Sequence, residues 1–96
     1  MHGTLTKADL ITAIQTENGY TYNKSSDIVE SLLNIIKRTL ASGEDVLITG
    51  FGKFQVREKS ERRGRNPATG DGMVLPARRV ITFKCAATLR ERINSD

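Results

Sequence analysis

The sequence holds few of the residues that cross-link a chain, bind metals or span membranes. It has a single cysteine, Cys85, and a single histidine, which excludes an intrachain disulfide and leaves no cluster of metal ligands. No apolar run approaches the ~18 residues that a membrane span requires. The segment Met1-His2-Gly3 also lacks the apolar stretch of a signal peptide. We therefore expect a soluble, cytoplasmic protein without a bound metal or cofactor.

Groups that could carry out catalysis are missing as well. The carboxylates stand singly on expected helix surfaces, and no candidate nucleophile has an evident base partner. Gly50-Phe51-Gly52 has neither the further spacing of a dinucleotide fingerprint nor the Lys-Ser/Thr of a phosphate loop. Cys85 has no second thiol to support a redox role and is expected to be a small packing residue. We therefore do not expect an enzyme.

The positive charge of the chain is concentrated in its second half. Residues 1–52 hold four Lys and Arg against six Asp and Glu, whereas residues 53–96 hold eleven against five. A near-neutral half followed by a basic half is typical of a packing module joined to a module that binds a polyanion. The length of 96 residues predicts that both halves belong to one domain, residues 1–96.

The first half predicts a hairpin of two helices. Thr6 can cap the first helix, with Asp9 at its third position, and Gly19 lies just past its end. A second helix is capped by Thr21 or Asn23 and ends near residue 41. The expected buried face of the first helix consists of Leu10, Ile11 and Ile14. The apolar residues of the second helix cover an arc of about 160°, wider than the ~100° stripe of an ordinary surface helix. They are Ile28, Val29, Leu32, Leu33, Ile35, Ile36 and Leu40.

The second half predicts a three-stranded antiparallel sheet and a short final helix, which makes the chain an α+β protein. The strands are expected at residues 46–48, 53–59 and 79–84. A tight turn at residues 50–52 joins the first two strands. Polar and apolar residues alternate along the longer strands, so one face of the sheet is expected to be apolar. The final helix covers residues 86–94, with Leu89 and Ile93 directed inward.

Residues 60–76 differ from the flanking strands because they hold almost nothing to bury. Their centre is Arg62-Arg63-Gly64-Arg65-Asn66-Pro67-Ala68-Thr69-Gly70, in which Gly and Asn-Pro indicate a turn. A long β-ribbon arm with a basic tip and one apolar proline suits double-stranded nucleic acid, which has phosphates outside and stacked bases inside. Pro67 could instead serve only to fix the turn, and the arginines could form a solvated face. Mutual repulsion among arginines around one ribbon favours an anionic partner.

A monomer of this size cannot cover all of its apolar surface. Without the arm, about 80 residues remain, which is near the size at which one core supplies only a few kcal/mol. The wide apolar arc of the second helix and the three phenylalanines therefore predict an intertwined dimer. The expected residues of the dimer core are Leu32, Leu33, Ile36, Phe51, Phe54 and Phe83.

Two motifs in the chain are specific when they occur together at this separation. They are Gly50-Phe51-Gly52-Lys53-Phe54 and Gly64-Arg65-Asn66-Pro67-Ala68-Thr69-Gly70. With them, the chain from Leu5 to Ile93 resembles the bacterial histone-like DNA-bending proteins, the family of HU and integration host factor. Within the family, Ala77-Arg78-Arg79-Val80-Ile81-Thr82-Phe83 looks most like the alpha subunit of integration host factor. The resemblance implies an αα-β-β-β-α subunit in an intertwined dimer whose two arms enter the minor groove.

The same resemblance implies which residues contact DNA and what they do. Pro67 matches the residue that wedges between base pairs at each arm tip. The arm positions that lie along the groove are matched by Arg62, Arg63, Arg65 and Asn66. Only one of Arg78 and Arg79 is expected to face DNA, because neighbours on a strand point to opposite sides. The full set of candidate DNA-binding residues is Lys53, Arg57, Lys59, Arg62, Arg63, Arg65, Asn66, Pro67, Arg78, Arg79 and Lys84.

The implied function is architectural, namely the bending or kinking of double-stranded DNA in nucleoid organisation, transcription regulation and recombination. An RNA-binding regulator with the same arms is the alternative, but A-form minor grooves are wide and shallow and give a thin ribbon fewer walls to contact. A purely structural oligomerisation domain does not account for an exposed arginine arm. The sequence leaves open whether the dimer joins two identical chains or this chain and a related subunit.

Overall fold

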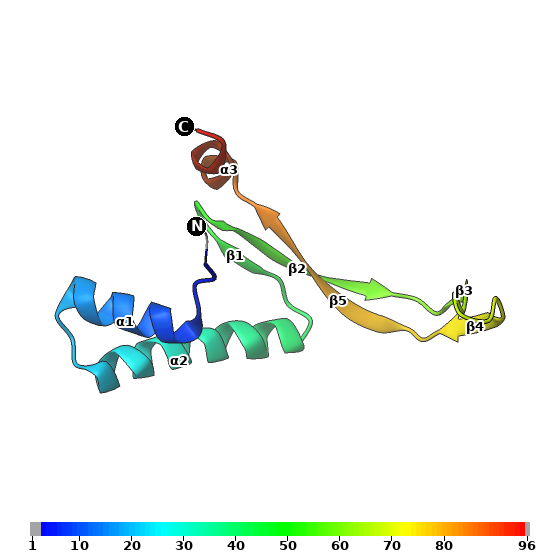
Figure 1. Cartoon of the computed structure of the whole chain (residues 1–96), viewed down its shortest axis with the longest axis horizontal. Helices are drawn as coiled ribbons and strands as arrows, with labels where there is room; N and C mark the ends of the chain where they lie inside the picture. Colours follow the sequence, from blue (N-terminus) through cyan, green and yellow to red (C-terminus); the bar gives the residue numbers. More distant parts are fainter. Residues whose placement is uncertain (1–2, 96) are drawn as a thin grey trace. The chain divides into compact units, whose positions relative to one another are not determined.

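The computed structural model describes residues 3–95, which divide between residues 38 and 39 into two compact units. The first unit contains helix α1, Lys7–Asn18, and most of helix α2, Tyr22–Ala41. The second contains the last turn of α2, five strands and helix α3, Ala87–Asn94 (Figure 1). This order of elements confirms the predicted α+β class. Met1 and His2, which formed part of the argument against a signal peptide, lie outside the described residues.

Helix α1 begins and ends where its sequence signals predict. The Thr6 hydroxyl accepts a hydrogen bond from the Asp9 amide at 3.2 Å, and the Asp9 carboxylate accepts one from the Thr6 amide at 2.9 Å. The bond from the Thr6 backbone favours the ionised carboxylate, so the pKa of Asp9 lies below its usual range. At the other end Gly19 adopts a φ of 68° and donates its N–H to the Gln15 carbonyl.

Helix α2 is capped by Thr21 rather than by Asn23. The Thr21 hydroxyl accepts a hydrogen bond from the Lys24 amide at 3.1 Å, and the helix then continues to Ala41 as predicted. Gly43, two residues after the end of the helix, adopts a left-handed φ of 93°.

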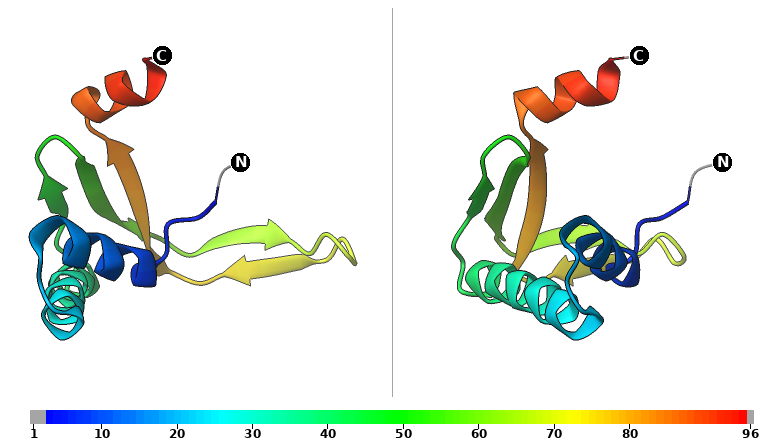
Figure 2. Two further views of the ribbon diagram at one scale, coloured as in Figure 1. Left: turned by 60° about the vertical axis from the view of Figure 1, so that its left-hand side comes forward. Right: turned by 90° about the vertical axis from the view of Figure 1, so that its left-hand side faces the viewer.

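The two helices lie side by side in all three views (Figures 1 and 2). An ion pair between Lys7 of α1 and Glu30 of α2 joins them, and the hydrogen bond from Lys7 lowers the pKa of Glu30. Ile11 is buried, as predicted for the first helix. Ile14 is only half-buried and Leu10 is exposed, so the prediction of a buried Leu10 is wrong for the single chain, because its hairpin partner covers one narrow strip.

The three-stranded sheet has the order β1-β2-β5, with all pairs antiparallel. Its strands are β1 (Val46–Ile48), β2 (Gly52–Lys59) and β5 (Arg78–Cys85). The turn between β1 and β2 closes with a hydrogen bond from the Phe51 amide to the Ile48 carbonyl at 3.0 Å. It therefore lies slightly earlier than predicted, and Gly52 already belongs to β2, where it pairs with Ile48 on one side and Cys85 on the other.

The arm is a separate two-stranded antiparallel ribbon formed by β3 (Arg62–Arg65) and β4 (Gly72–Leu75). It extends from one end of the three-stranded sheet, while α3 stands at the opposite end (Figure 2). The protruding ribbon confirms the arm that was predicted for residues 60–76. The arm carries more apolar surface than its sequence suggested, because Met73 and Val74 are both exposed on β4.

Helix α3 is attached to the turn before β2. The Ala86 amide donates to the Phe51 carbonyl at 2.9 Å, and the Thr88 hydroxyl donates to the Gly50 carbonyl at 3.2 Å. Leu89 is half-buried, but Ile93 is 67% exposed, so the prediction that Ile93 points inward is wrong for the single chain. The cause is that the hydrogen bonds to the turn come from Ala86 and Thr88, at the start of this eight-residue helix, whereas Ile93 lies near its other end. Among residues 3–95, no helix is long and apolar enough to cross a membrane.

Candidate nucleic-acid interface

The register of β2 against β5 separates the sheet into two faces of different chemistry. Because side chains alternate along a strand, odd-numbered residues of β2 share a face with even-numbered residues of β5. Five of the predicted DNA-binding residues meet on that face, which we call the basic face. They are Lys53, Arg57, Lys59, Arg78 and Lys84. Alternation along β2 alone predicts that Lys53, Arg57 and Lys59 share a face. The register places Arg78 and Lys84 of β5 on the same face.

Like charges stand directly opposite each other at both ends of the basic face. Lys53 pairs with Lys84, and Lys59 pairs with Arg78. Such cross-strand pairs destabilise a sheet by themselves, so a bound polyanion would relieve the repulsion. Within the described residues, the basic face has one carboxylate in contact, Asp45, which lies 3.8 Å from the Lys53 ammonium. The other oxygen of Asp45 accepts from the Val56 amide at 2.9 Å and so extends the β1–β2 ladder.

The opposite face of the sheet is apolar. Its centre is Phe83, whose ring centroid lies 5.4 Å from that of Phe51 and 4.9 Å from that of Phe54. Residues 3–95 cover this cluster only in part, since Phe83 is 46% exposed and Ile81 beside it is 54% exposed. The three phenylalanines predicted for a dimer core are thus brought together and left open to solvent on one side.

Arg79 is the one predicted DNA-binding residue of β5 that lies on this second face. Its Nε donates to Glu58 at 2.8 Å, and its Nη1 donates to the Ala41 carbonyl at 3.0 Å. Of the two neighbouring arginines, Arg78 therefore lies on the basic face, whereas Arg79 lies on the second face and binds groups of the chain itself. Sequence reasoning missed Glu58, because its role depends on standing opposite Arg79 in the ladder.

The tip of the arm is a closed loop that holds Pro67 outward. The Asn66 amide donates to the Asp71 carbonyl at 2.8 Å, and the Gly70 amide donates to the Asn66 carbonyl at 2.7 Å. The Asn66 side chain accepts from the Ala68 amide at 2.9 Å, which fixes the backbone on either side of Pro67. Pro67 is exposed and lies at the end of the ribbon. The role that the structure shows for Asn66 is to shape this loop.

The arm arginines divide between the two faces of the ribbon. Arg62 stands opposite Leu75, whereas Arg63 and Arg65 lie on the other face together with Val74. The Arg65 guanidinium reaches the Gly70 carbonyl at 3.5 Å, at the limit of a hydrogen bond. Within residues 3–95 none of the three forms an ion pair, so their charges remain available to a ligand.

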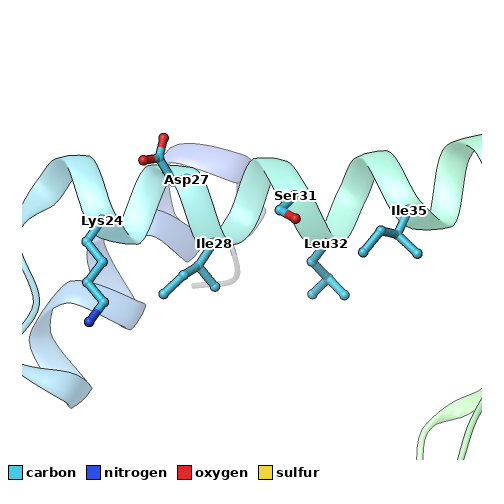
Figure 3. A pocket seen from close by; sticks show the side chains of 6 residues that line it. All are labelled: Lys24, Asp27, Ile28, Ser31, Leu32 and Ile35. Carbon is cyan, nitrogen blue, oxygen red and sulfur yellow. The ribbon is translucent and has the colours of Figure 1, made fainter.

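The first unit carries an exposed apolar stripe on α2, which consists of Ile28, Leu32 and Ile35. Figure 3 shows these three side chains projecting in the same direction. Leu32 is its most exposed member, at 56%, while the other predicted core residues of α2, Leu33 and Ile36, are half-buried. The stripe lines a shallow open groove together with polar neighbours. The lining residues are Lys24, Asp27, Ile28, Ser31, Leu32 and Ile35.

No group of three or more His, Cys, Asp or Glu that could hold a metal ion occurs within residues 3–95. Cys85 is a half-buried free thiol at the end of β5.

The described residues thus form a sheet with one cationic face and an exposed cationic ribbon. This combination defines a small β-ribbon protein for binding a polyanion. The sequence matches the family described as bacterial DNA-binding protein over residues 5–94. The chain therefore belongs to that family, which includes HU and integration host factor, and the predicted resemblance is confirmed.

Named relatives span nearly the whole chain. The integration host factor subunit alpha of Erythrobacter litoralis is 48% identical, over 95% of this chain and 91% of the relative. The same subunit from an Anaeromyxobacter species is 43% identical, over 94% and 91%. Among solved structures, a cocrystal of Anabaena HU with DNA matches with a TM-score of 0.82 and 32% identity, over 95% of this chain and 99% of that chain. The expected similarity to the alpha subunit agrees with these relatives.

Proposed function

We propose that this chain is a subunit of an architectural DNA-binding protein that bends duplex DNA. The observation that carries the proposal is the coincidence of a one-sided basic face with an exposed ribbon that ends in Pro67. Family membership and the similarity to a DNA-bound HU structure support the same ligand. The family is one of DNA-binding proteins, in line with the expectation that the chain is not an enzyme. It would act on the nucleoid, in the bacterial cytoplasm.

In this proposal the two basic surfaces act in sequence. The arm arginines hold the ribbon in the minor groove by contacts to the phosphates on both sides, which gives affinity with little dependence on sequence. Pro67 then enters a base step and partly unstacks it, at a cost of a few kcal/mol. The kinked duplex can lie along the basic face, where Lys53, Lys84 and their neighbours gain phosphate contacts. Site preference would follow DNA deformability and groove width, since the minor groove encodes little sequence.

Two arms require two subunits, and we propose that the apolar surfaces are covered by a second copy or a related subunit. Phe83 with its neighbours and the stripe on α2 are each too exposed for a stable monomer. Ile81→Lys is expected to prevent dimerisation, because it places a charge on the apolar face. Leu47→Lys is the matched control, since Leu47 is 70% exposed but stands beside Lys53 on the basic face.

Native mass spectrometry of the pure chain measures this directly. A dimer of the wild type and of Leu47→Lys, with monomer for Ile81→Lys, would support self-association. Dimerisation only after addition of a related subunit would support the heterodimer. A folded wild-type monomer at nanomolar concentration that pairs with neither would contradict the proposal.

The wedge is tested by replacing Pro67 with Ala and measuring energy transfer between dyes at the two ends of a duplex. Bending should fall much more than affinity, because the arginines supply most of the attraction. Pro76→Ala is the matched control, since Pro76 is exposed but lies at the root of the arm, between β4 and β5. Unchanged energy transfer for Pro67→Ala would show that Pro67 serves only the turn. Stronger binding to structured RNA than to duplex DNA would favour the RNA-binding alternative.

A further inference from the structure

The root of the arm is held by a three-part contact centred on Arg79. Glu58 and Arg79 face each other in the second-last pair of the β2–β5 ladder, just before the chain leaves the three-stranded sheet. Beyond the last pair, two connecting residues on each strand lead into the ribbon. The direction in which the ribbon leaves the sheet therefore depends on how firmly this end of the ladder is fixed.

The Arg79 guanidinium binds two partners from different elements, one in strand β2 and one at the end of helix α2. Besides Glu58, it binds the carbonyl of Ala41, the last residue of α2. Carbonyls in the last turn of a helix lack intrahelical donors and carry the negative end of the helix dipole, so a cation is well matched there. Gly43 lies beside this contact, and a Cβ at that position would lie 3.5 Å from the guanidinium, in ordinary van der Waals contact with it. The planar fork of Arg can donate in both directions at once, which a Lys ammonium does less well.

We propose that Arg79 is a positioning residue that fixes the root of the arm to the end of α2 and does not bind DNA. This inference rests on the proposed function, because the direction of an arm matters only if the arms embrace a duplex. It explains why an acidic residue, Glu58, occurs in β2 between Arg57 and Lys59: it is the partner of Arg79 on the opposite face. With this contact broken, the ribbon keeps its strands but samples more directions, and DNA binding must then supply the cost of ordering it.

Arg78 provides a matched control one residue away. It stands on the basic face, opposite Lys59, and its guanidinium reaches only the nearby Pro76 carbonyl at 3.4 Å within the described residues. The two arginines therefore have the same charge and nearly the same position along the strand, but they face opposite sides of the sheet.

The first test compares Arg79→Ala with Arg78→Ala on a duplex, using the slope of log affinity against log salt and the transfer of energy between duplex ends. Arg78→Ala should lower the slope by about 0.9, the value for one lost phosphate contact. Arg79→Ala should leave the slope unchanged and reduce the bent fraction. Glu58→Ala should reduce the bent fraction in the same way, although it removes a negative charge. An equal loss of slope in both arginine variants, or a gain in bending by Glu58→Ala, would overturn the proposal.

The second test needs no DNA, and so separates this inference from the proposed function. Amide hydrogen exchange of the free protein should become faster near residues 56–60 and 76–80 in Arg79→Ala and in Glu58→Ala, but not in Arg78→Ala. The other end of the ladder, near Gly52, should keep its wild-type rates in all three. Unchanged exchange at the arm root in Arg79→Ala would overturn the proposal even if the wild type bends DNA. A wild type that does not bend DNA, with exchange altered as expected, would refute the proposed function instead.

Discussion

Gly52→Ala is expected to destabilise the protein, because the added methyl group has no room. Gly52 is buried, and a Cβ there would lie 2.5 Å from Cε1 of Phe83 and 2.7 Å from the Lys84 carbonyl oxygen. The Phe83 ring cannot turn away without losing its contacts with Phe51 and Phe54. The carbonyl belongs to the backbone of β5, where Lys84 pairs with Lys53, so it moves only if the ladder opens.

The size of the effect follows from two opposing contributions. Overpacking of a filled site costs about 1–3 kcal/mol. Replacing Gly by Ala restricts the unfolded chain and returns about 0.4–1 kcal/mol. The midpoints of these two ranges leave a net loss of about 1.3 kcal/mol, which lowers the Tm of a domain of this size by about 5–10 °C. The melting temperatures must be compared at one protein concentration, because the stability of the proposed dimer would depend on it.

The matched control is Gly72→Ala, in β4 of the arm. A Cβ at Gly72 meets nothing within 4 Å, and its backbone is not in the left-handed region, so the same change should leave the Tm unchanged or raise it slightly. Thermal unfolding followed by circular dichroism measures both variants. If Gly52→Ala has the same Tm as the wild type, Phe83 and the backbone of β5 move away from the added methyl group without loss of stability, and the reasoning from close packing is refuted.

Three further predictions concern charge, pH and the free arm. Arg65→Ala should lower the slope of log affinity against log salt by about 0.9, and an unaltered slope in filter-binding titrations would mean that Arg65 stays solvated in the complex. The pKa of Asp9 is lower in the folded protein than in the unfolded chain. The helix cap therefore stabilises the folded state fully above the unfolded pKa of about 4, and this stabilisation is lost as the pH falls through the lower pKa of the folded state. In urea titrations, the free energy of unfolding should therefore be higher for the wild type than for Asp9→Ala near neutral pH, and the two values should converge in strong acid. A difference that does not change with pH would contradict the capping role. Amides of the arm should exchange rapidly without DNA and slowly with it, since few apolar contacts hold β3 and β4; strong protection in the free protein would indicate a preformed arm.

Much of the fold was readable from the sequence because its signals are local. The capping box of Thr6 and Asp9 involves residues three apart, and Gly19 ends its helix through its own backbone freedom. The arm was likewise predictable, since Asn66-Pro67 and the glycines exclude a buried strand whatever surrounds them. Such signals predict where an element begins, ends or turns.

For the candidate site, the sequence names basic residues that could bind DNA, but it does not say how they are arranged. Sequence reasoning expected one of Arg78 and Arg79 to face DNA but could not say which, because the answer depends on the partner strand. Burial was misjudged for Leu10 and Ile93 for a similar reason, since apolar periodicity shows which side of a helix is apolar but not whether the chain covers it.

By itself, the sequence determined the helix caps, the alternating strands, the basic arm and the excess of apolar surface that calls for a partner. The tertiary structure alone decided that Arg79 binds Glu58 and the end of α2, that Lys53 faces Lys84, and that Gly52 lies under Phe83. These four contacts join residues at least 21 positions apart in the chain. Those within the sheet arise from the pairing register of β2 with β5, and a shift of that register by one residue would exchange the two faces of the sheet.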